Sequence, residues 1–142
     1  MSPDAKIYRV DAAGKATLFA SLKARYVWAL LANADGSFYA ATGDPGQIHK
    51  ITAGGQASVF FDAEETHVRA LAADAKGNLI AGTEPGGVVL RVSPAGAGFV
   101  LYQTAKREVT ALLVAQDGTV FAAAAGNRGP AVPAMPAVVV QA

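Results

Sequence analysis

The chain has 142 residues, enough for one domain with a buried core of its own. Its 12 basic and 11 acidic residues give a net charge of +1, so nothing in the charge favours a nucleic-acid or membrane partner. It contains no cysteine, which excludes disulfides, thiolate nucleophiles and thiolate metal ligands. Only 16% of the residues are charged, against ~25% in ordinary domains, which indicates sheets packed on both faces or surface hidden in an assembly.

No stretch approaches the ~20 apolar residues that a membrane helix needs. The first ten residues, MSPDAKIYRV, lack the hydrophobic core of a signal peptide. We therefore expect no membrane association. The compartment stays open, with the cytoplasm as the default unless the chain is a piece of a longer protein.

The first part of the chain predicts short strands separated by glycine-bearing turns. Strands are expected at residues 7–10, 16–20, 27–32, 37–42 and 48–52. Turns are expected at residues 11–15, 33–36 and 43–47, with a polar connection at 21–26. A helical interpretation fails, because the turns interrupt every apolar run before it reaches helical length.

The same order of strands and turns returns twice along the chain. One leucine recurs at equal spacing, as Leu30, Leu71 and Leu112. One glycine recurs at the same spacing, as Gly36, Gly77 and Gly118. We call this spacing, the separation of Leu30 from Leu71 along the chain, the repeat interval. Further strands are expected at residues 57–61, 68–73, 78–83, 88–92, 98–102, 109–114 and 119–124, and two more polar connections at 62–67 and 103–108.

Four short antiparallel strands in each repeat interval are typical of a β-propeller blade. We predict an all-β fold with three repeats per chain, over residues 1–129. Two blades are expected at residues 27–61 and 68–102. A third is split between outer strands at 7–20 and inner strands at 109–124. The tail at residues 130–142, rich in proline, alanine and valine, is expected to be an extended linker or a truncated remnant. The alternative is that its last apolar residues add to a sheet edge.

The repeats resemble those of the NHL, sensor-regulator and gluconolactonase-like propellers. The resemblance rests on DGSFYAATG at residues 35–43 and GNLIAGTEPGG at residues 77–87. Each is followed by a hydrophobic-x-basic-hydrophobic strand, at residues 48–51 and 89–92. The resemblance covers residues 7–129 and implies a propeller fold, which serves signalling, adhesion, scaffolding and catalysis alike.

Three repeats are too few for a closed ring, since propellers have about four to eight blades. We expect a C2 homodimer of six blades, in which the N-terminal strands of each chain complete the C-terminal blade of the other. The alternative is that the chain is a fragment of a longer, sensor-type propeller whose other blades lie elsewhere.

The resemblance to gluconolactonases implies a divalent metal held by carboxylates and asparagine on the inner strands. The matching strands here, at residues 27–32, 68–73 and 109–114, contain neither. His49 and His67 also lack partners at metal-ligand spacing. We therefore assign no catalytic residue, metal or cofactor. A non-catalytic module for ligand or protein binding or scaffolding is favoured over a lactonase- or esterase-like hydrolase.

The candidate binding face carries the variable connections and turns, because loops on a rigid scaffold carry function. Trp28, Arg69 and Thr110 share one repeat position there, and stacking and hydrogen bonding by the first two suit a sugar, a peptide or an anionic ligand. The alternative is that Trp28 packs between blades and Arg69 pairs with Glu64 or Glu65. The full set of candidate ligand-binding residues is Tyr26, Trp28, Asp44, His67, Arg69, Glu84 and Thr110.

Overall fold

A computed structural model describes residues 4–127, which form ten β-strands. The strands are β1 Ala5–Val10, β2 Ala16–Leu22, β3 Tyr26–Ala32, β4 Phe38–Ile51, β5 Ala57–Ala73, β6 Leu79–Glu84, β7 Val88–Val92, β8 Gly98–Gln103, β9 Lys106–Val114 and β10 Val120–Asn127. In this part of the chain no helix is long and apolar enough to cross a bilayer. The predicted linker at residues 130–142 lies outside the described residues.

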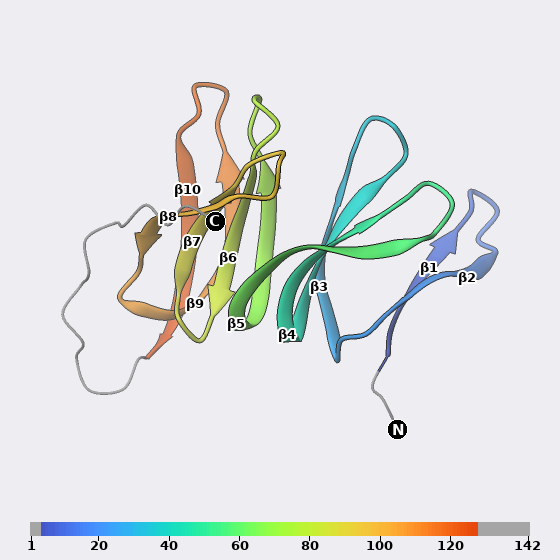
Figure 1. Cartoon of the computed structure of the whole chain (residues 1–142), viewed down its shortest axis with the longest axis horizontal. Coiled ribbons are helices and arrows are strands. Elements are labelled where there is room, and N and C mark those ends of the chain that lie inside the picture. The colour runs from blue at the N-terminus through green and yellow to red at the C-terminus, as the bar shows by residue number, and fades with distance from the viewer. Residues whose placement is uncertain (1–3, 128–142) are drawn as a thin grey trace.

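The strands form three antiparallel sheets, which confirms the expected all-β, antiparallel class. The largest has six strands in the order β3-β4-β5-β6-β7-β8, and β1–β2 and β9–β10 form two separate two-stranded sheets. Figure 1 shows the β1–β2 pair at one end of the molecule and the β9–β10 pair in the group of strands at the other end. The first and last strands of the chain are therefore far apart.

Six hairpin turns share one backbone arrangement, which explains the regular spacing of glycine. In each, the N–H of the glycine donates to the carbonyl three residues earlier, and the glycine has a φ between 83° and 90°. Only glycine adopts this left-handed conformation without a steric cost. The six residues are Gly14, Gly36, Gly55, Gly77, Gly96 and Gly118.

Strand β4 differs from the prediction, which placed two strands around a turn at residues 43–47. The structure assigns one element, Phe38–Ile51, that bends back on itself. The buried hydroxyl of Thr42 holds the bend, donating to the carbonyls of Pro45 and Gln47 and accepting from the N–H of Gln47. The ladder continues through the bend because Gly43 and Gly46 pair with His67 and Glu65 of β5.

Strand β5 also differs, because the predicted polar connection at residues 62–67 lies inside it. Its first part pairs with β4 and its last part, from His67 onward, pairs with β6. Figure 1 shows β5 crossing from the strands around β4 to the strands around β6. The polar residues are extended because the glycines of β4 offer them ladder partners.

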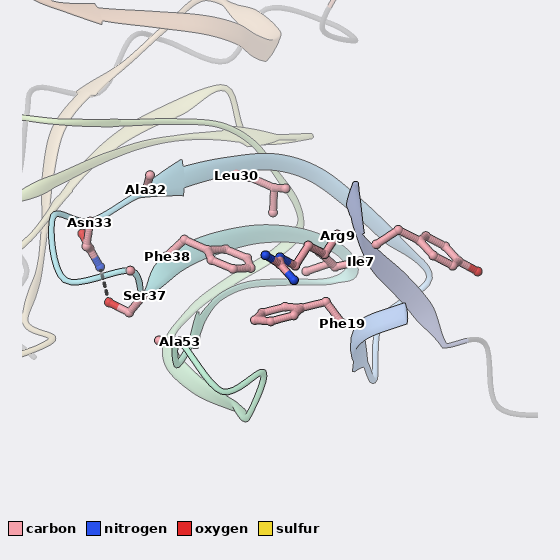
Figure 2. A pocket seen from close by; sticks show the side chains of 11 residues that line it. Ile7, Arg9, Phe19, Leu30, Ala32, Asn33, Ser37, Phe38 and Ala53 are labelled. Atoms are coloured by element: carbon pink, nitrogen blue, oxygen red, sulfur yellow. Dashed lines mark hydrogen bonds between the residues drawn. The ribbon is translucent and has the colours of Figure 1, made fainter. Parts of the chain in front are cut away.

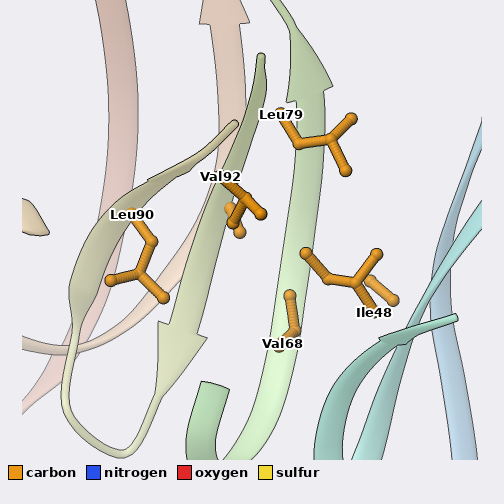
Figure 3. Packing of buried hydrophobic residues seen from close by; sticks show 7 residues of the cluster. Ile48, Val68, Leu79, Leu90 and Val92 are labelled. Carbon is orange, nitrogen blue, oxygen red and sulfur yellow. The ribbon is translucent and has the colours of Figure 1, made fainter. Parts of the chain in front are cut away.

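Three buried apolar clusters lie between successive groups of strands. The largest joins β4 and β5 to β6 and β7 through residues such as Ile48, Val68, Leu79 and Val92 (Figure 3). A second joins β1 and β2 to β4, with Ile7, Leu22 and Ile51, and a third joins β6 and β7 to β9, with Ile80, Val89 and Val109. Each fully buried side chain of this size contributes about 1.5–3 kcal/mol. This packing between groups of strands holds the strand ends of the candidate site in place.

Candidate functional site

Seven side chains from four strands meet in what we term the aromatic–ion-pair cluster. It lies at the start of β3, the middle of β5, the end of β6 and the start of β9. The ladder brings these points together, since Gly43 pairs with both Tyr26 and His67, and His67 pairs with Glu84. The cluster consists of Tyr26, Trp28, His67, Arg69, Glu84, Arg107 and Glu108.

The aromatic part of the cluster is centred on Trp28. Its ring stacks with that of Tyr26 at a centroid distance of 4.9 Å and an interplanar angle of 22°. Its indole N–H donates to Nδ1 of His67 at 3.2 Å, and the guanidinium carbon of Arg69 lies 4.0 Å from its ring centroid. Despite these contacts Trp28 remains 38% exposed. Trp28 is thus held in place with part of its surface open to solvent, while Tyr26 and Arg69 lie against its ring.

Gly43 makes the contact between Trp28 and His67 possible. A Cβ at this position would lie 2.1 Å from Nδ1 of His67 and 2.3 Å from Nε1 of Trp28. Any side chain at residue 43 would therefore occupy the space of the hydrogen bond itself. Glycine is required here for room and not for its backbone angles, because its φ is ordinary.

The charged part of the cluster is a chain of ion pairs. Nε of Arg69 lies 3.8 Å from Glu84 and 3.9 Å from Glu108, and Nε of Arg107 lies 3.6 Å from the other oxygen of Glu84. Arg69 and both carboxylates are mostly shielded from solvent, whereas Arg107 is more exposed. Two cations and two anions balance, so the cluster carries no net charge when all four are ionised.

The expected alternative partners of Arg69 were wrong. Arg69 does not pair with Glu64 or Glu65, because the ladder places it beside β6 and β9, where Glu84 and Glu108 project. Glu65 instead accepts a hydrogen bond from the buried hydroxyl of Thr83 at 3.3 Å. The charge of Arg69 is therefore held next to Trp28 by residues from two other strands.

The structure brings together five of the seven predicted site residues. The other two have partners elsewhere: Asp44 forms an exposed ion pair with Arg25 at 3.7 Å, and the hydroxyl of Thr110 donates to the carbonyl of Ala123 at 3.4 Å. Sequence reasoning missed Gly43, Arg107 and Glu108. Glu108 carried a signal, because it follows His67 by one repeat interval.

The residues present do not fit the divalent metal that the gluconolactonase resemblance implies. Within residues 4–127, no group of three or more histidine, aspartate or glutamate side chains is arranged to hold a metal ion. The two carboxylates of the cluster each face an arginine, which is not the donor set of a hard cation.

The sheet arrangement defines a propeller-like β-fold, and solved structures with the same arrangement exist. A calcium-binding protein, regucalcin, from Agrobacterium tumefaciens str. C58 aligns with 86% of this chain and 45% of its own length, at 18% identity and a TM-score of 0.65. Virginiamycin B lyase from Staphylococcus aureus aligns with 96% of this chain and 47% of its own length, at 14% identity and a TM-score of 0.67. The chain thus spans about half the length of these two structures. No family model and no curated protein matches it.

Proposed function

We propose that the chain is a non-catalytic β-propeller module of three repeats that binds a small, neutral, ring-containing ligand such as a sugar at the aromatic–ion-pair cluster. One observation carries the proposal. Trp28 is fixed by Tyr26, His67 and Arg69 and yet keeps more than a third of its surface exposed. A side chain that is already fixed loses little conformational entropy when a ligand contacts its exposed part.

The charges around Trp28 favour a neutral ligand over an anion. Arg69 already faces two carboxylates, so an anion would compete with Glu84 and Glu108 for the same guanidinium. A hydroxyl-rich ring has no such conflict, because hydroxyls both donate and accept hydrogen bonds. The cluster offers carboxylate acceptors and arginine donors beside the aromatic surface, which suits a polyol ring.

The ligand can be tested directly, because Trp28 is the single tryptophan of the chain. We expect neutral hexoses or their oligosaccharides to change Trp28 fluorescence in a saturable way, and the matching uronic acids to bind more weakly. Tyr26→Ala should weaken binding about 2–12-fold, as the loss of one aromatic pair implies. Val59→Ala, an exposed change outside the cluster, should leave binding intact.

Three results would redirect the proposal. Tighter binding of the uronic acids would mean that Arg69 exchanges its carboxylate partners for the ligand. Hydrolysis of a lactone or ester, or a rise in melting temperature with Ca²⁺, would favour the hydrolase alternative. If no saccharide changes the fluorescence, the sugar proposal fails. Scaffolding within a longer, sensor-type propeller would then be the next function to test.

A further inference from the structure

Large apolar side chains are exposed at both ends of the molecule. On β9 and β10, Leu113 is 62% exposed and Phe121 is 57% exposed. At the opposite end of the molecule, Leu30 of β3 is 55% exposed, and Tyr8 and Val10 of β1 are exposed too. Isolated exposed apolar residues are common, but a concentration at two sheet ends marks an interaction surface.

The equivalent positions of neighbouring repeats are packed where the chain provides a neighbour. The counterparts of Leu113 and Phe121, two repeat intervals earlier, are Leu31 and Tyr39, which pack against the largest cluster. The counterpart of Leu30, one interval later, is Leu71, which packs against the same cluster. The two exposed ends are thus the two halves of a contact that the chain already makes once internally.

A cavity lies where the equivalents of Leu31 and Tyr39 would pack beside Leu30. It has a volume of about 520 Å³ and lies between the β1–β2 pair and β3. Figure 2 shows Phe19, Leu30 and Phe38 gathered around it, together with Ile7 of β1. In the internal contact, Leu31 and Tyr39 pack against the same buried cluster as Leu71, and Leu79 belongs to that cluster.

We propose that a second copy of this chain inserts its β9–β10 hairpin between β1 and β3, with Leu113 and Phe121 entering this cavity and β10 pairing antiparallel with β1. The same contact made in the opposite direction closes two copies into one ring. This pairing covers the edges of β1 and β10 that no strand of residues 4–127 pairs with.

The internal β6–β7 ladder fixes the register of this pairing. There, Leu79 pairs with Val92, Ile80 with Arg91 and Ala81 with Leu90. The residues of β10 lie one repeat interval after those of β6, and the residues of β1 lie two intervals before those of β7. The equivalent pairs between the copies are therefore Val120 with Val10, Phe121 with Arg9 and Ala122 with Tyr8.

The chemistry of the central pair agrees with this register. Nζ of Lys50 lies 5.8 Å from the ring centroid of Tyr39, and these residues occupy the same repeat positions as Arg9 and Phe121. The proposed contact therefore sets the guanidinium of Arg9 over the ring of Phe121, a pairing that arginine favours.

A second copy also extends the candidate site. Two contacts of the cluster join residues 39 apart, Trp28 to His67 and Arg69 to Glu108. If the second copy continues the repeats, the same separation starting from Thr110 of one copy ends at Tyr26 of the other. We therefore expect these two residues to be in contact between the copies. The inference rests on the propeller class proposed above but not on the ligand, so a failed sugar titration leaves it standing.

The register can be tested by disulfide trapping, because the chain has no cysteine of its own. Tyr8→Cys combined with Ala122→Cys should give, on oxidation, a doubly linked dimer of twice the 14.4 kDa chain. Tyr8→Cys with Phe121→Cys is the matched control. Neighbouring residues of a strand point to opposite faces, so this variant should not cross-link efficiently. A ladder of larger products would overturn the closed pair of copies, and equal cross-linking of both variants would overturn the register.

A measurement without cysteines guards against variants that fold poorly. The unmodified chain should have the mass of a dimer by light scattering after size exclusion, and Leu113→Glu should reduce it to a monomer with unchanged circular dichroism. Val59→Glu, at a position that is also exposed but outside both proposed faces, should remain dimeric. A monomeric unmodified chain would overturn the proposal and indicate that other blades cover these ends.

Discussion

The indole N–H of Trp28 donates to Nδ1 of His67 at 3.2 Å, between residues that lie 39 apart in the sequence. The indole nitrogen can only donate, so Nδ1 of His67 is the acceptor of this bond. This one bond ties the start of β3 to the middle of β5 and sets the orientation of the aromatic surface. The space for it comes from Gly43, which carries no side chain.

Gly43→Ala should break this bond. The added Cβ would overlap both ring nitrogens, so we expect a loss of about 1–3 kcal/mol in the free energy of unfolding and a shift in Trp28 emission. Chemical denaturation with fluorescence detection measures both. Gly54→Ala is the matched control, since its Cβ would meet only Thr52 Oγ1 at 3.8 Å. Equal effects at the two positions would contradict this role for Gly43.

Thr83→Val should destabilise the chain although it preserves shape. The buried hydroxyl of Thr83 accepts from the N–H of Val88 at 3.0 Å and lies 3.3 Å from Glu65 Oε1. Valine would leave that N–H without its acceptor, at a cost of about 1–3 kcal/mol in the free energy of unfolding. Thr17→Val, on an exposed position, should change it by less than about 0.5 kcal/mol. Urea denaturation of the two variants makes the comparison.

Glu84→Gln should cost more than removal of the exposed pair at Asp44. Glu84 faces both Arg69 and Arg107 and is mostly shielded, so its loss leaves two cations close together. We expect a loss of about 1 kcal/mol in the free energy of unfolding that shrinks in high salt. Asp44→Asn breaks an ion pair in which both side chains are more than half exposed, and we expect little change. Thermal melts at low and high ionic strength will distinguish the two.

Acid should destabilise the fold through His49. Burial lowers the pKa of His49 below its ordinary value of 6.5, so the folded state resists a proton that the unfolded state takes up. The stability that neutral His49 contributes is complete above that value and is lost as the pH falls from there toward the folded pKa. His49→Leu, which copies Leu90 one repeat later, should flatten this pH dependence. Unfolding measured at intervals from pH 8 to pH 5 tests it, and an unchanged slope would assign the acid sensitivity to another group.

The sequence allowed prediction of the hairpins but not of the path between them. The glycines that repeat at fixed intervals identified the turns, because a left-handed residue is a local requirement visible in the chain. The bend in β4 and the continuity of β5 depend on which residues face each other across the ladder, as Gly46 faces Glu65. The polar residues at 62–67 were therefore predicted to be a loop, because the sequence does not show that they pair with β4.

The candidate site could likewise be predicted where the signal is local, but not where it depends on which strands are neighbours. Trp28 and Arg69 stood out by type and shared repeat position, and they are in contact. The pairing of Arg69 with Glu84 and Glu108 required the spatial order of β5, β6 and β9, which no local pattern encodes. Gly43 was invisible as a site residue, since its role is to leave space.

The course of β5 restricts how this chain can vary in length. Insertions at the tips of the six hairpin turns would extend loops into solvent, where added residues disturb few contacts. An insertion within β5 would shift its pairing with β4 on one side or β6 on the other, and turn apolar side chains to the wrong face. Relatives that gain residues should therefore gain them at the turns, and their spacing across β5 should stay constant.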